Sequence, residues 1–426
     1  MTSSPTIAAV RLTPVLVADP PLLNTQGVHQ PQTPRLVIEV ETTGGVVGLG
    51  ETYGDGHCLA LAARLAEALK GHPVANVNLL LRIAESLAAS DGGDLDESVS
   101  AGGLRGAQSL HKLVRSVVSG FEVACLDALG RTLGLPVHVL LGGKVRDQVP
   151  YAAYLFYKWD RHPGGPVDHW GAALDPAGLV AQARRMVELH GFDSFKLKGG
   201  VFPPEQEVAA IRALAEAFPG RPLRLDPNGA WSVPTALRVA EQLSDVLEYL
   251  EDPTAGTAAM AELAARSPLP LATNMCVTGF EEVREAFTAG AVQVVLSDHH
   301  YWGGLRATQQ LAAVCRTFGV GLSMHSNTHL GISLAAMTQV AATLPNLDHP
   351  CDSHYPWLTE DVITSQHRFH SGSLTVTDTP GLGVELDRTA LERLHRRWTE
   401  DDGTLRERDD TAAIRRAVPG WTSSTW

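Results

Sequence analysis

The stretch FDSFKLKGGVFPPEQEVAAIRALAEAFPGRPLRLD, residues 192–226, decides the fold. It begins with a short apolar run, continues through a segment whose apolar residues recur roughly every three or four positions, and ends with a second short apolar run. This order is typical of a β-strand, an amphipathic helix and a second strand. Two strands joined through a helix in this way lie parallel, so the stretch predicts a parallel sheet.

Strand-like runs of this kind recur along the middle of the chain and alternate with amphipathic segments. The runs are VPYAAYLFY (149–157), FDSFKLK (192–198), PLRLD (222–226), VLEYLE (246–251), LPLATN (269–274), VQVVLSD (292–298) and GVGLSMH (319–325), with an eighth expected near 347–354. Repeated strand–helix units of this number predict a closed (β/α)8 barrel, the TIM-type α/β fold. The alternative is a doubly wound open sheet, but the glycine fingerprint that follows the first strand of that fold is absent.

The regions on either side of the barrel predict a smaller capping domain. The segment PRLVIEVETTGGVVGLGET (34–52) alternates about a Thr-Gly-Gly break, which is typical of a β-hairpin. Helices are expected at 57–70, 76–89 and 108–133, with a Gly/Asp-rich loop, SDGGDLDES, at 90–98. We therefore predict an α+β capping domain at 1–145, the barrel at 146–370, and a C-terminal segment at 371–426 that packs back on the capping domain.

Composition and charge exclude several classes of function. The 426 residues carry 34 Lys+Arg and 47 Asp+Glu, a net charge of −13, so the chain as a whole has no attraction for nucleic acid or anionic membranes. The start lacks the basic and apolar regions of a signal peptide, and no run of about 18 apolar residues occurs. Five scattered cysteines without a CxxC pair favour reduced thiols in a cytoplasm over disulfides or a zinc ribbon.

Polar residues stand at the ends of six consecutive predicted strands. They are Lys196 and Lys198, Asp226 with Asn228, Glu251, Asn274, Asp298, and His325. Each alone has an ordinary explanation, such as a solvated lysine pair, an Asp-Pro-Asn-Gly turn or a helix cap. In a barrel, however, all these positions meet at one rim, the C-terminal face, where active sites lie. The set therefore predicts an active site there.

Three of these side chains predict a metal site. Asp226, Glu251 and Asn274 offer oxygen ligands from three neighbouring strands, without cysteine or histidine. Hard oxygen donors favour Mg²⁺, which keeps coordination sites for water and for substrate oxygens. Two carboxylates and a neutral amide balance the double positive charge of the ion without exceeding it, so the site can still take an anionic ligand.

The remaining strand-end residues predict two opposed bases. Lys196 and Lys198 are expected on one side of the metal, where crowding would lower the pKa of at least one lysine. Asp298 and His325 are expected on the other side, with the carboxylate fixing the imidazole tautomer. A metal between two bases suits removal of a proton α to a carboxylate, with the resulting enediolate stabilised by the metal.

Other histidines have weaker patterns. His325 and His329 have the spacing of a helical zinc pair, but Ser326 stands where such sites need Glu, so His329 is expected near a helix start. His299 and His300 are neighbours, which we expect to point in different directions and not to share a metal ion.

Several longer motifs resemble the glucarate dehydratase family of the enolase superfamily, in its mandelate racemase-like branch. In the barrel they are FKLKGGV, LDPNGAW, LEDP, LATNM, LSDHHYWGG and SMHSNTHLGISLA, and outside it LLNTQGVHQP, SVVSGFEVACLDALG, AYLFY, CDSHYPW, RERDD and VPGW. They cover nearly the whole chain in the family's order. The Lys-x-Lys pair marks the branch, and the Asn ligand together with His-Ser-Asn after the seventh strand is the more specific feature.

The resemblance implies a role for each matching position. As bases it implies Lys198 and His325, the latter paired with Asp298, and as Mg²⁺ ligands Asp226, Glu251 and Asn274. Lys196 would contact the substrate carboxylate and stabilise the enediolate. Asn228, Ser326 and Asn327 would contact the substrate near the reacting carbons, and His29, Tyr154, His354 and Arg408 would bind it further out. A guanidinium binds a carboxylate at two points, so Arg408 with His29 would suit the far carboxylate.

The implied activity is that of a hydro-lyase, converting D-glucarate or L-idarate to 5-dehydro-4-deoxy-D-glucarate with Mg²⁺. We expect a cytoplasmic homo-oligomer whose partner is a small dicarboxylate sugar acid. The sequence departs from the family where a substrate-binding Thr is expected: GGLRGAQSLHKLVRS (102–116) offers only Ser109 nearby, and the loop TAGTAAMAE (254–262) has no charge before Glu262. The alternatives are a dehydratase of another aldarate or aldonate, an acid-sugar epimerase, and a relative that has lost activity.

Overall fold

The computed structural model describes residues 5–90, 98–100 and 107–426. Its centre is a sheet of parallel strands in the order β14-β13-β12-β11-β10-β9-β8-β15. The strands are β8 (Gln148–Phe156), β9 (Phe195–Lys198), β10 (Leu223–Asp226), β11 (Leu247–Glu251), β12 (Leu271–Thr273), β13 (Val294–Ser297), β14 (Gly321–Met324) and β15 (Cys351–Ser353). Each coincides with a predicted apolar run, and the last falls within 347–354 as expected. The predicted (β/α)8 architecture is confirmed.

Helices separate these strands along the chain. They are α5 (Pro176–His190), α6 (Pro204–Ala217), α7 (Val233–Leu243), α8 (Thr257–Ala264), α9 (Phe280–Thr288), α10 (His299–Trp302), α11 (Leu305–Phe318) and α12 (Gly331–Thr343). Ordinary end signals set their limits. Asp175 begins α5 by accepting the Gly178 N–H at 2.7 Å, and Gly191, at φ 70°, ends it in the left-handed region.

The barrel is nearly closed. Among the described residues no strand ladder joins β14 to β15, and the seam is held by the segment before β15. Asp348 and His349 donate backbone N–H bonds to Leu322 O at 3.0 and 3.3 Å, and Ser323 Oγ donates to Pro350 O at 2.9 Å. These bonds keep the ends of β14 and β15 side by side on the same rim.

The capping domain is built on an antiparallel sheet in the order β1-β4-β5. Its strands are β1 (Ile7–Ala18), β4 (Gln32–Thr42) and β5 (Val47–Tyr53), and the last two form the predicted hairpin. The helix α3 (Leu110–Leu133) lies on β4 and β5, with α1 (Gly56–Ala68) and α2 (Asn78–Ala89) beside it. Gly48 and Gly50 allow this approach, because a Cβ there would lie 2.1 and 2.0 Å from backbone oxygens of α3.

Short elements connect the larger ones. β2 (Leu23–Asn24) pairs with β3 (Gly27–Val28), β6 (Ser98–Ser100) pairs with β7 (Ala107–Ser109), and α4 (Val137–Leu140) leads into the barrel. A 3-10 turn, Tyr355–Trp357, follows β15. Of the predicted loop at 90–98, residues 91–97 lie outside the described residues.

Strand β1 is the largest element that the sequence patterns do not predict. Pro14 interrupts its run, and proline is tolerated there because β1 pairs only with β4 and forms the edge of the sheet. Helix α13 (Arg388–Glu400) covers this edge. His395 Nδ1 donates to Pro14 O at 2.7 Å, and Arg397 Nη1 donates to Leu16 O at 3.3 Å.

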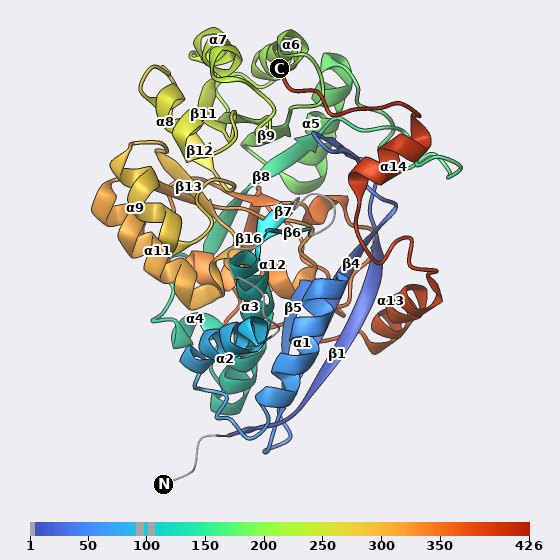
Figure 1. Cartoon of the computed structure of the whole chain (residues 1–426), viewed down its shortest axis with the longest axis vertical. Helices are drawn as coiled ribbons and strands as arrows, with labels where there is room; N and C mark the ends of the chain where they lie inside the picture. Colours follow the sequence, from blue (N-terminus) through green and yellow to red (C-terminus); the bar gives the residue numbers. More distant parts are fainter. Residues whose placement is uncertain (1–4, 91–97, 101–106) are drawn as a thin grey trace.

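The C-terminal segment contacts both parts of the molecule. β16 (Ser373–Thr375) pairs antiparallel with β8, α13 lies on β1, and α14 (Asp410–Ala417) lies on β3. Trp426 donates its backbone N–H to Ala230 O at 2.8 Å, beside the barrel rim. Figure 1 shows this red segment leaving α13, passing α14 and ending near α6 and α7. The division of the chain into domains, with its boundaries, stays a prediction.

None of the described helices is long and apolar enough to cross a membrane.

Candidate active site

A pocket of about 130 Å³ opens among the C-terminal ends of the barrel strands. Its wall consists of Lys112, Tyr154, Phe156, Lys198, Asn228, Asn274, Met275, Tyr301, His325, Ser326, Asn327 and His354. Most of the predicted site residues are therefore in this wall. The other predicted residues are buried and do not line it: His29, Lys196, Asp226, Glu251, Asp298 and Arg408.

The two lysines of β9 share one carboxylate on β10. Because they alternate with Leu197, both ammonium groups point to the same face, and their Nζ atoms lie 3.4 and 2.7 Å from Asp226 Oδ2. Lys196 is fully buried and also bonds Glu251 Oε1 at 2.5 Å and Asp352 Oδ2 at 2.6 Å. Lys198 reaches the pocket wall.

Acidic neighbours keep both lysines charged. Burial lowers the pKa of Lys196, but Asp352 and Glu251 outweigh it and raise that pKa well above its usual range. The pKa of Lys198 is also raised, because Asp226 outweighs burial there. The expectation that crowding beside Mg²⁺ lowers at least one lysine pKa stays a prediction, because here each ammonium lies directly against carboxylate oxygens that the metal ion would itself bind.

The Asp-Pro-Asn-Gly turn holds Asn228 in place. Asn228 has φ 55°, a left-handed conformation that asparagine tolerates, and its N–H donates to Asp226 Oδ1 at 3.0 Å. Its side-chain Oδ1 accepts from Lys198 Nζ at 2.7 Å, and its Nδ2 donates to Thr25 Oγ1 at 3.2 Å. The motif is therefore both an ordinary turn, as its residues suggest, and part of the site, because it brings Asn228 to Lys198.

The three predicted metal ligands lie on adjacent strands. Asn274 Nδ2 donates to Glu251 Oε1 at 2.6 Å, and Asp226 is linked to Glu251 through Lys196. Asp252, at φ 37°, accepts the Asn274 N–H at 2.8 Å and so fixes the backbone of that residue. Burial raises the pKa of Asp252 to about 7.

The donor set fits Mg²⁺. Glu251 Oε2 is buried, and no described residue offers it a hydrogen bond. Burial raises the pKa of Glu251 well above its usual range, and Asp226 and Asp352 add to this effect although Lys196 opposes it. A dication among these oxygens would satisfy the orphaned oxygen and favour the ionised carboxylates. Two carboxylates and one amide oxygen are the hard donors that this ion prefers.

His325 and Asp298 form a pair on the other side of the pocket. His325 Nδ1 lies 3.2 Å from Asp298 Oδ2, and a carboxylate only accepts, so Nδ1 carries the proton. The remaining ring nitrogen, Nε2, is then free to take a proton from a ligand. Burial lowers the pKa of His325 below its usual value, partly offset by Asp298, so the ring is neutral at pH 7.

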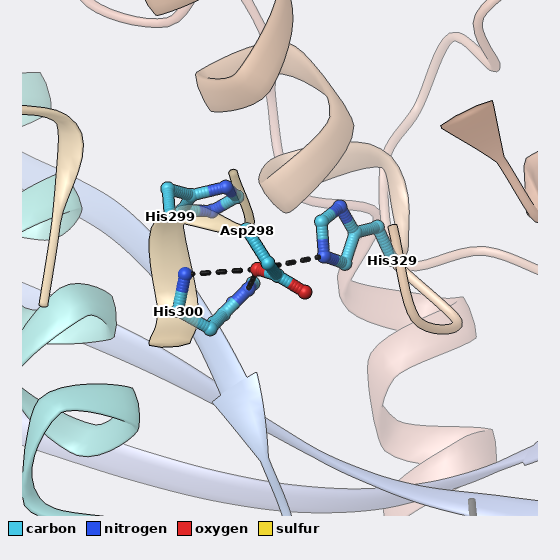
Figure 2. A group of neighbouring side chains, drawn as sticks. All are labelled: Asp298, His299, His300 and His329. Atoms are coloured by element: carbon cyan, nitrogen blue, oxygen red, sulfur yellow. Dashed lines mark hydrogen bonds and ion pairs between the residues drawn. The ribbon is translucent and has the colours of Figure 1, made fainter. Parts of the chain in front are cut away.

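Asp298 is the centre of a group of imidazoles, which Figure 2 shows with Asp298 between His300 and His329. Its Oδ1 lies 3.1 Å from His300 Nδ1, 2.9 Å from His300 N and 3.6 Å from His329 Nε2. The ring centroids of His299 and His300 lie 4.1 Å apart, so the expectation that these neighbours diverge is wrong. His299 and His300 are the first two residues of the short helix α10, which follows Asp298 directly.

This group contains enough donor atoms to hold a metal ion, since one atom from each of Asp298, His299, His300 and His329 lies within 4.8 Å of the others. Its hydrogen bonds favour a simpler function. His300 Nε2 lies 3.1 Å from Glu51 O and 3.2 Å from Ser333 Oγ, so both of its ring nitrogens already have partners. The group therefore holds Asp298 in position and connects it to β5 and α12.

The outer wall of the pocket comes from β8, β14 and the residues after β15. Ser326 Oγ accepts the His354 N–H at 3.0 Å, and Asn327 Nδ2 donates to Tyr301 Oη at 3.4 Å. Tyr154 lies beside Lys196, whose Nζ is 4.9 Å from the ring centroid, and burial raises the tyrosine pKa to about 12. The structure thus brings the predicted substrate-binding residues of the barrel to one cavity.

His29 and Arg408 lie one layer behind this wall. Asp19, fully buried, bonds His29 Nδ1 at 3.2 Å, His354 Nε2 at 3.2 Å, Arg408 Nη1 at 3.0 Å and Thr33 Oγ1 at 2.8 Å. These residues are therefore connected to the pocket through His354. Two buried atoms of the cluster, His29 Nε2 and Arg408 Nη2, have no hydrogen-bond partner in the part of the chain that the structure describes.

Sequence reasoning missed four residues of this site. Asp352 stands two residues before His354 on β15, so strand alternation could have indicated that it points inward. Asp252 and Asp19 act through bonds between distant segments, for which no local signal exists. The last is Lys112, which lines the pocket near the segment where a Thr was sought, whereas Ser109 begins α3 by accepting the Lys112 N–H at 3.3 Å.

Two family descriptions match the chain. "Mandelate racemase / muconate lactonizing enzyme, N-terminal domain" matches residues 7–142, and "Enolase C-terminal domain-like" matches residues 178–390. The chain is also 68% identical over 426 residues to the probable glucarate dehydratase of Streptomyces coelicolor, with 99% of both chains covered.

Solved structures agree with these matches. An enolase from Mycobacterium smegmatis complexed with tartrate superposes with a TM-score of 0.93 at 52% identity, covering 100% of both chains. An enolase from Thermobispora bispora complexed with magnesium and formate has a TM-score of 0.94 at 51% identity, covering 99% of this chain and 100% of that one.

Proposed function

The chain belongs to the enolase superfamily, and from that premise we propose that it is a Mg²⁺-dependent acid-sugar dehydratase whose substrate is D-glucarate. The probable glucarate dehydratase of Streptomyces coelicolor supports this substrate, and the magnesium bound to the Thermobispora bispora enolase supports the metal.

One observation carries the proposal: two proton-transfer groups face one pocket from opposite parts of the barrel. Lys198 ends β9 and His325 follows β14, with β8 and β15 between them on one side and β10 to β13 on the other. Asn274, one of three oxygen donors, lies in the same wall. This arrangement suits removal of a proton from either face of a carbon next to a carboxylate.

Each residue then has a defined task. Depending on the configuration of that carbon, His325 Nε2 or Lys198 Nζ takes the proton. Lys198 can do so only as the neutral amine, after it has given up the proton that Asp226 stabilises. Lys196 is buried beside Tyr154 of the pocket wall, and it would supply positive charge as negative charge develops on the substrate carboxylate. Mg²⁺ held by Asp226, Glu251 and Asn274 would place its double positive charge next to the negative charge that develops on the substrate carboxylate.

Loss of water completes the reaction. The hydroxyl on the next carbon leaves as water after receiving a proton, for which His325 is placed, and a carbon–carbon double bond forms. The resulting enol takes a proton at the deoxygenated carbon and releases its hydroxyl proton to give 5-dehydro-4-deoxy-D-glucarate. Asn228, Ser326 and Asn327 would hold the hydroxyls near the reacting carbons, with Tyr154 and His354 further out.

His29 and Arg408 would act on the substrate from behind this wall. Through Asp19 they fix the ring of His354. If the wall opens, Arg408 Nη2 would donate to a substrate oxygen and His29 Nε2 would accept from a substrate hydroxyl.

Replacement of His325 tests the proposal. We expect His325→Asn to abolish keto-acid formation from D-glucarate while calorimetry still detects Mg²⁺ binding, because the ligands lie on other strands. The exposed His57→Asn is the matched control and should keep full activity. Unchanged turnover in His325→Asn would contradict the assignment. Exchange of the α-proton with deuterated solvent by the wild-type protein, without keto-acid formation, would favour an epimerase instead.

A further inference from the structure

One buried carboxylate near the pocket takes no part in the proposed chemistry. Glu51 stands on β5 of the antiparallel sheet, and its side chain reaches the start of helix α12 in the barrel. Arg35, on the neighbouring strand β4, donates to Glu51 Oε1 through Nε at 2.9 Å and through Nη2 at 2.6 Å. The guanidinium thus holds the carboxylate in one orientation, with both oxygens toward α12.

Helix α12 begins at a residue that cannot cap it. The first N–H groups of a helix need acceptors from outside, and Leu330, at the N-cap position, has an aliphatic side chain. Glu51 supplies the acceptors instead: Oε1 accepts the Leu330 N–H at 2.9 Å, and Oε2 accepts the Ser333 N–H at 2.9 Å. Burial raises the pKa of Glu51, but Arg35 and these N–H groups outweigh it, so the carboxylate is ionised and also favours the helix dipole.

The segment that Glu51 anchors contains the proposed base. Strand β14 ends at Met324 and α12 begins at Gly331, so residues 325–330 cross the barrel rim between them. The start of this segment is fixed because the His325 N–H donates to Ser297 O at 2.9 Å. Glu51 fixes its other end through Leu330. The positions of the three segment residues that line the pocket therefore depend on both anchors; they are His325, Ser326 and Asn327.

The backbone of Glu51 also supports the partner of this base. Glu51 O lies 3.1 Å from His300 Nε2, and the His300 N–H donates to Asp298 Oδ1 at 2.9 Å. Asp298 Oδ2 in turn accepts from His325 Nδ1. One residue of β5 is thus linked to both members of the pair, whereas Lys198, the other proton-transfer group, is held by Asp226 on β10.

We propose that Glu51 is a positioning residue for His325: its carboxylate sets the path of residues 325–330 and thereby aims the imidazole at the substrate carbon. The inference rests on the proposed function, which gives His325 the proton transfer. The rival explanation is that Glu51 only neutralises the buried Arg35 and stabilises the fold. A loss of stability would affect both proton-transfer groups alike, whereas a displaced segment would affect His325 and spare Lys198.

The test compares two diacids in D₂O. D-glucarate and L-idarate differ in configuration at the carbon that loses its proton, so His325 and Lys198 each serve one of them. The rate of α-proton loss is measured for both, and His325→Asn identifies the diacid that His325 serves. For that diacid Glu51→Gln should slow the loss about ten- to hundredfold, because the amide nitrogen cannot accept an N–H and a base displaced by about 1 Å loses a rate of this order. The rate for the other diacid should stay within about twofold.

Control variants separate positioning from stability. Arg35→Gln removes the partner of Glu51 but keeps the carboxylate that caps α12, so it should lower the melting temperature and leave the ratio of the two rates within about twofold. Glu41→Gln makes the same chemical change at an exposed position of β4 and should behave like the wild type. If Glu51→Gln does not fold, the double variant Arg35→Gln/Glu51→Gln removes the cap without leaving a buried guanidinium unpaired, and it should show the same selective loss.

Equal slowing for both diacids in a folded Glu51→Gln protein, or unchanged rates, would overturn the positioning role. If the wild type removes the α-proton from neither diacid, the proposed function fails. Amide hydrogen exchange of residues 325–334 then still tests Glu51: exchange about tenfold faster in Glu51→Gln than in the wild type supports the anchor, and equal exchange overturns it.

Discussion

Replacing Asp298 with Asn tests how the pocket prepares its base. The carboxylate accepts from His325 Nδ1 at 3.2 Å through one oxygen and from the His300 N–H at 2.9 Å through the other. After Asp298→Asn, the amide oxygen can keep the bonds to His300, which directs the new amide nitrogen toward His325. Because that nitrogen donates, His325 Nδ1 must accept, and the proton moves to Nε2, the atom that should receive the substrate proton.

The magnitude follows from this change of tautomer. When the imidazole of the base is held in the wrong tautomer, the kcat of the enzyme falls about 10⁴-fold, which corresponds to about 5.4 kcal/mol of transition-state stabilisation. Stability should change far less, by roughly one hydrogen bond to a charged group, about 1.5–3 kcal/mol. The large effect is therefore expected on kcat rather than on folding.

The assay follows keto-acid formation from D-glucarate at saturating Mg²⁺, with a thermal melt of the same sample. The exposed Asp193→Asn, whose side chain is 83% accessible, is the matched control. A kcat for Asp298→Asn within tenfold of the wild type, in a folded protein, would refute the tautomer argument. If the melting temperature of Asp298→Asn falls sharply together with kcat, the assay is repeated at a lower temperature, at which the variant is folded.

Three further predictions concern pH, metal and stability. The value of kcat/KM should fall as pH drops through a value below 6.5, because burial lowers the pKa of His325 and only the neutral ring is a base. An acid limb of the pH–rate profile with its midpoint above pH 7 would contradict this. Asp252→Asn should weaken Mg²⁺ binding about 10- to 100-fold in calorimetry, since it removes an acceptor beside Asn274, and equal affinity would exclude that support. Glu248→Gln should lower the free energy of unfolding by about 1.5–3 kcal/mol at pH 7, because it removes the nearer of the two carboxylates that pair with the buried Arg224 and leaves only Asp352, at 3.8 Å. Since His349 and Arg224 outweigh burial and hold the pKa of Glu248 at about 2, this contribution is present above about 4.5 and lost as pH falls toward 2, so denaturant melts of the two proteins should converge there.

The barrel was predictable because its signals are local and repeated. Each strand run ends in a polar residue, and parallel strands in a barrel place those ends on one rim. Lys196, Lys198 and Asp226 could therefore be grouped from their positions in sequence alone, and the structure places their charged atoms within 3.4 Å. Strand β1 could not be predicted in the same way, because its stability depends on pairing with β4 and cover by α13.

Residues that act through distant contacts were beyond local reasoning. Asp19 links His29, His354 and Arg408, which come from three separate regions of the chain. The pKa of Lys198 depends on the distance from its Nζ to a particular carboxylate. The sequence indicates only that carboxylates lie near this lysine, so the shift could not be predicted from it. Lys112 reads as an ordinary helix residue until the fold shows that its turn faces the pocket.

Dehydration of D-glucarate is tested most directly by the product that the purified protein forms from it in D₂O. We expect 5-dehydro-4-deoxy-D-glucarate to appear only when Mg²⁺ is present, with one deuterium at the carbon that has lost its hydroxyl. No keto acid from D-glucarate or L-idarate, under conditions in which the α-proton exchanges with solvent, would contradict dehydration and leave an epimerase on the same scaffold.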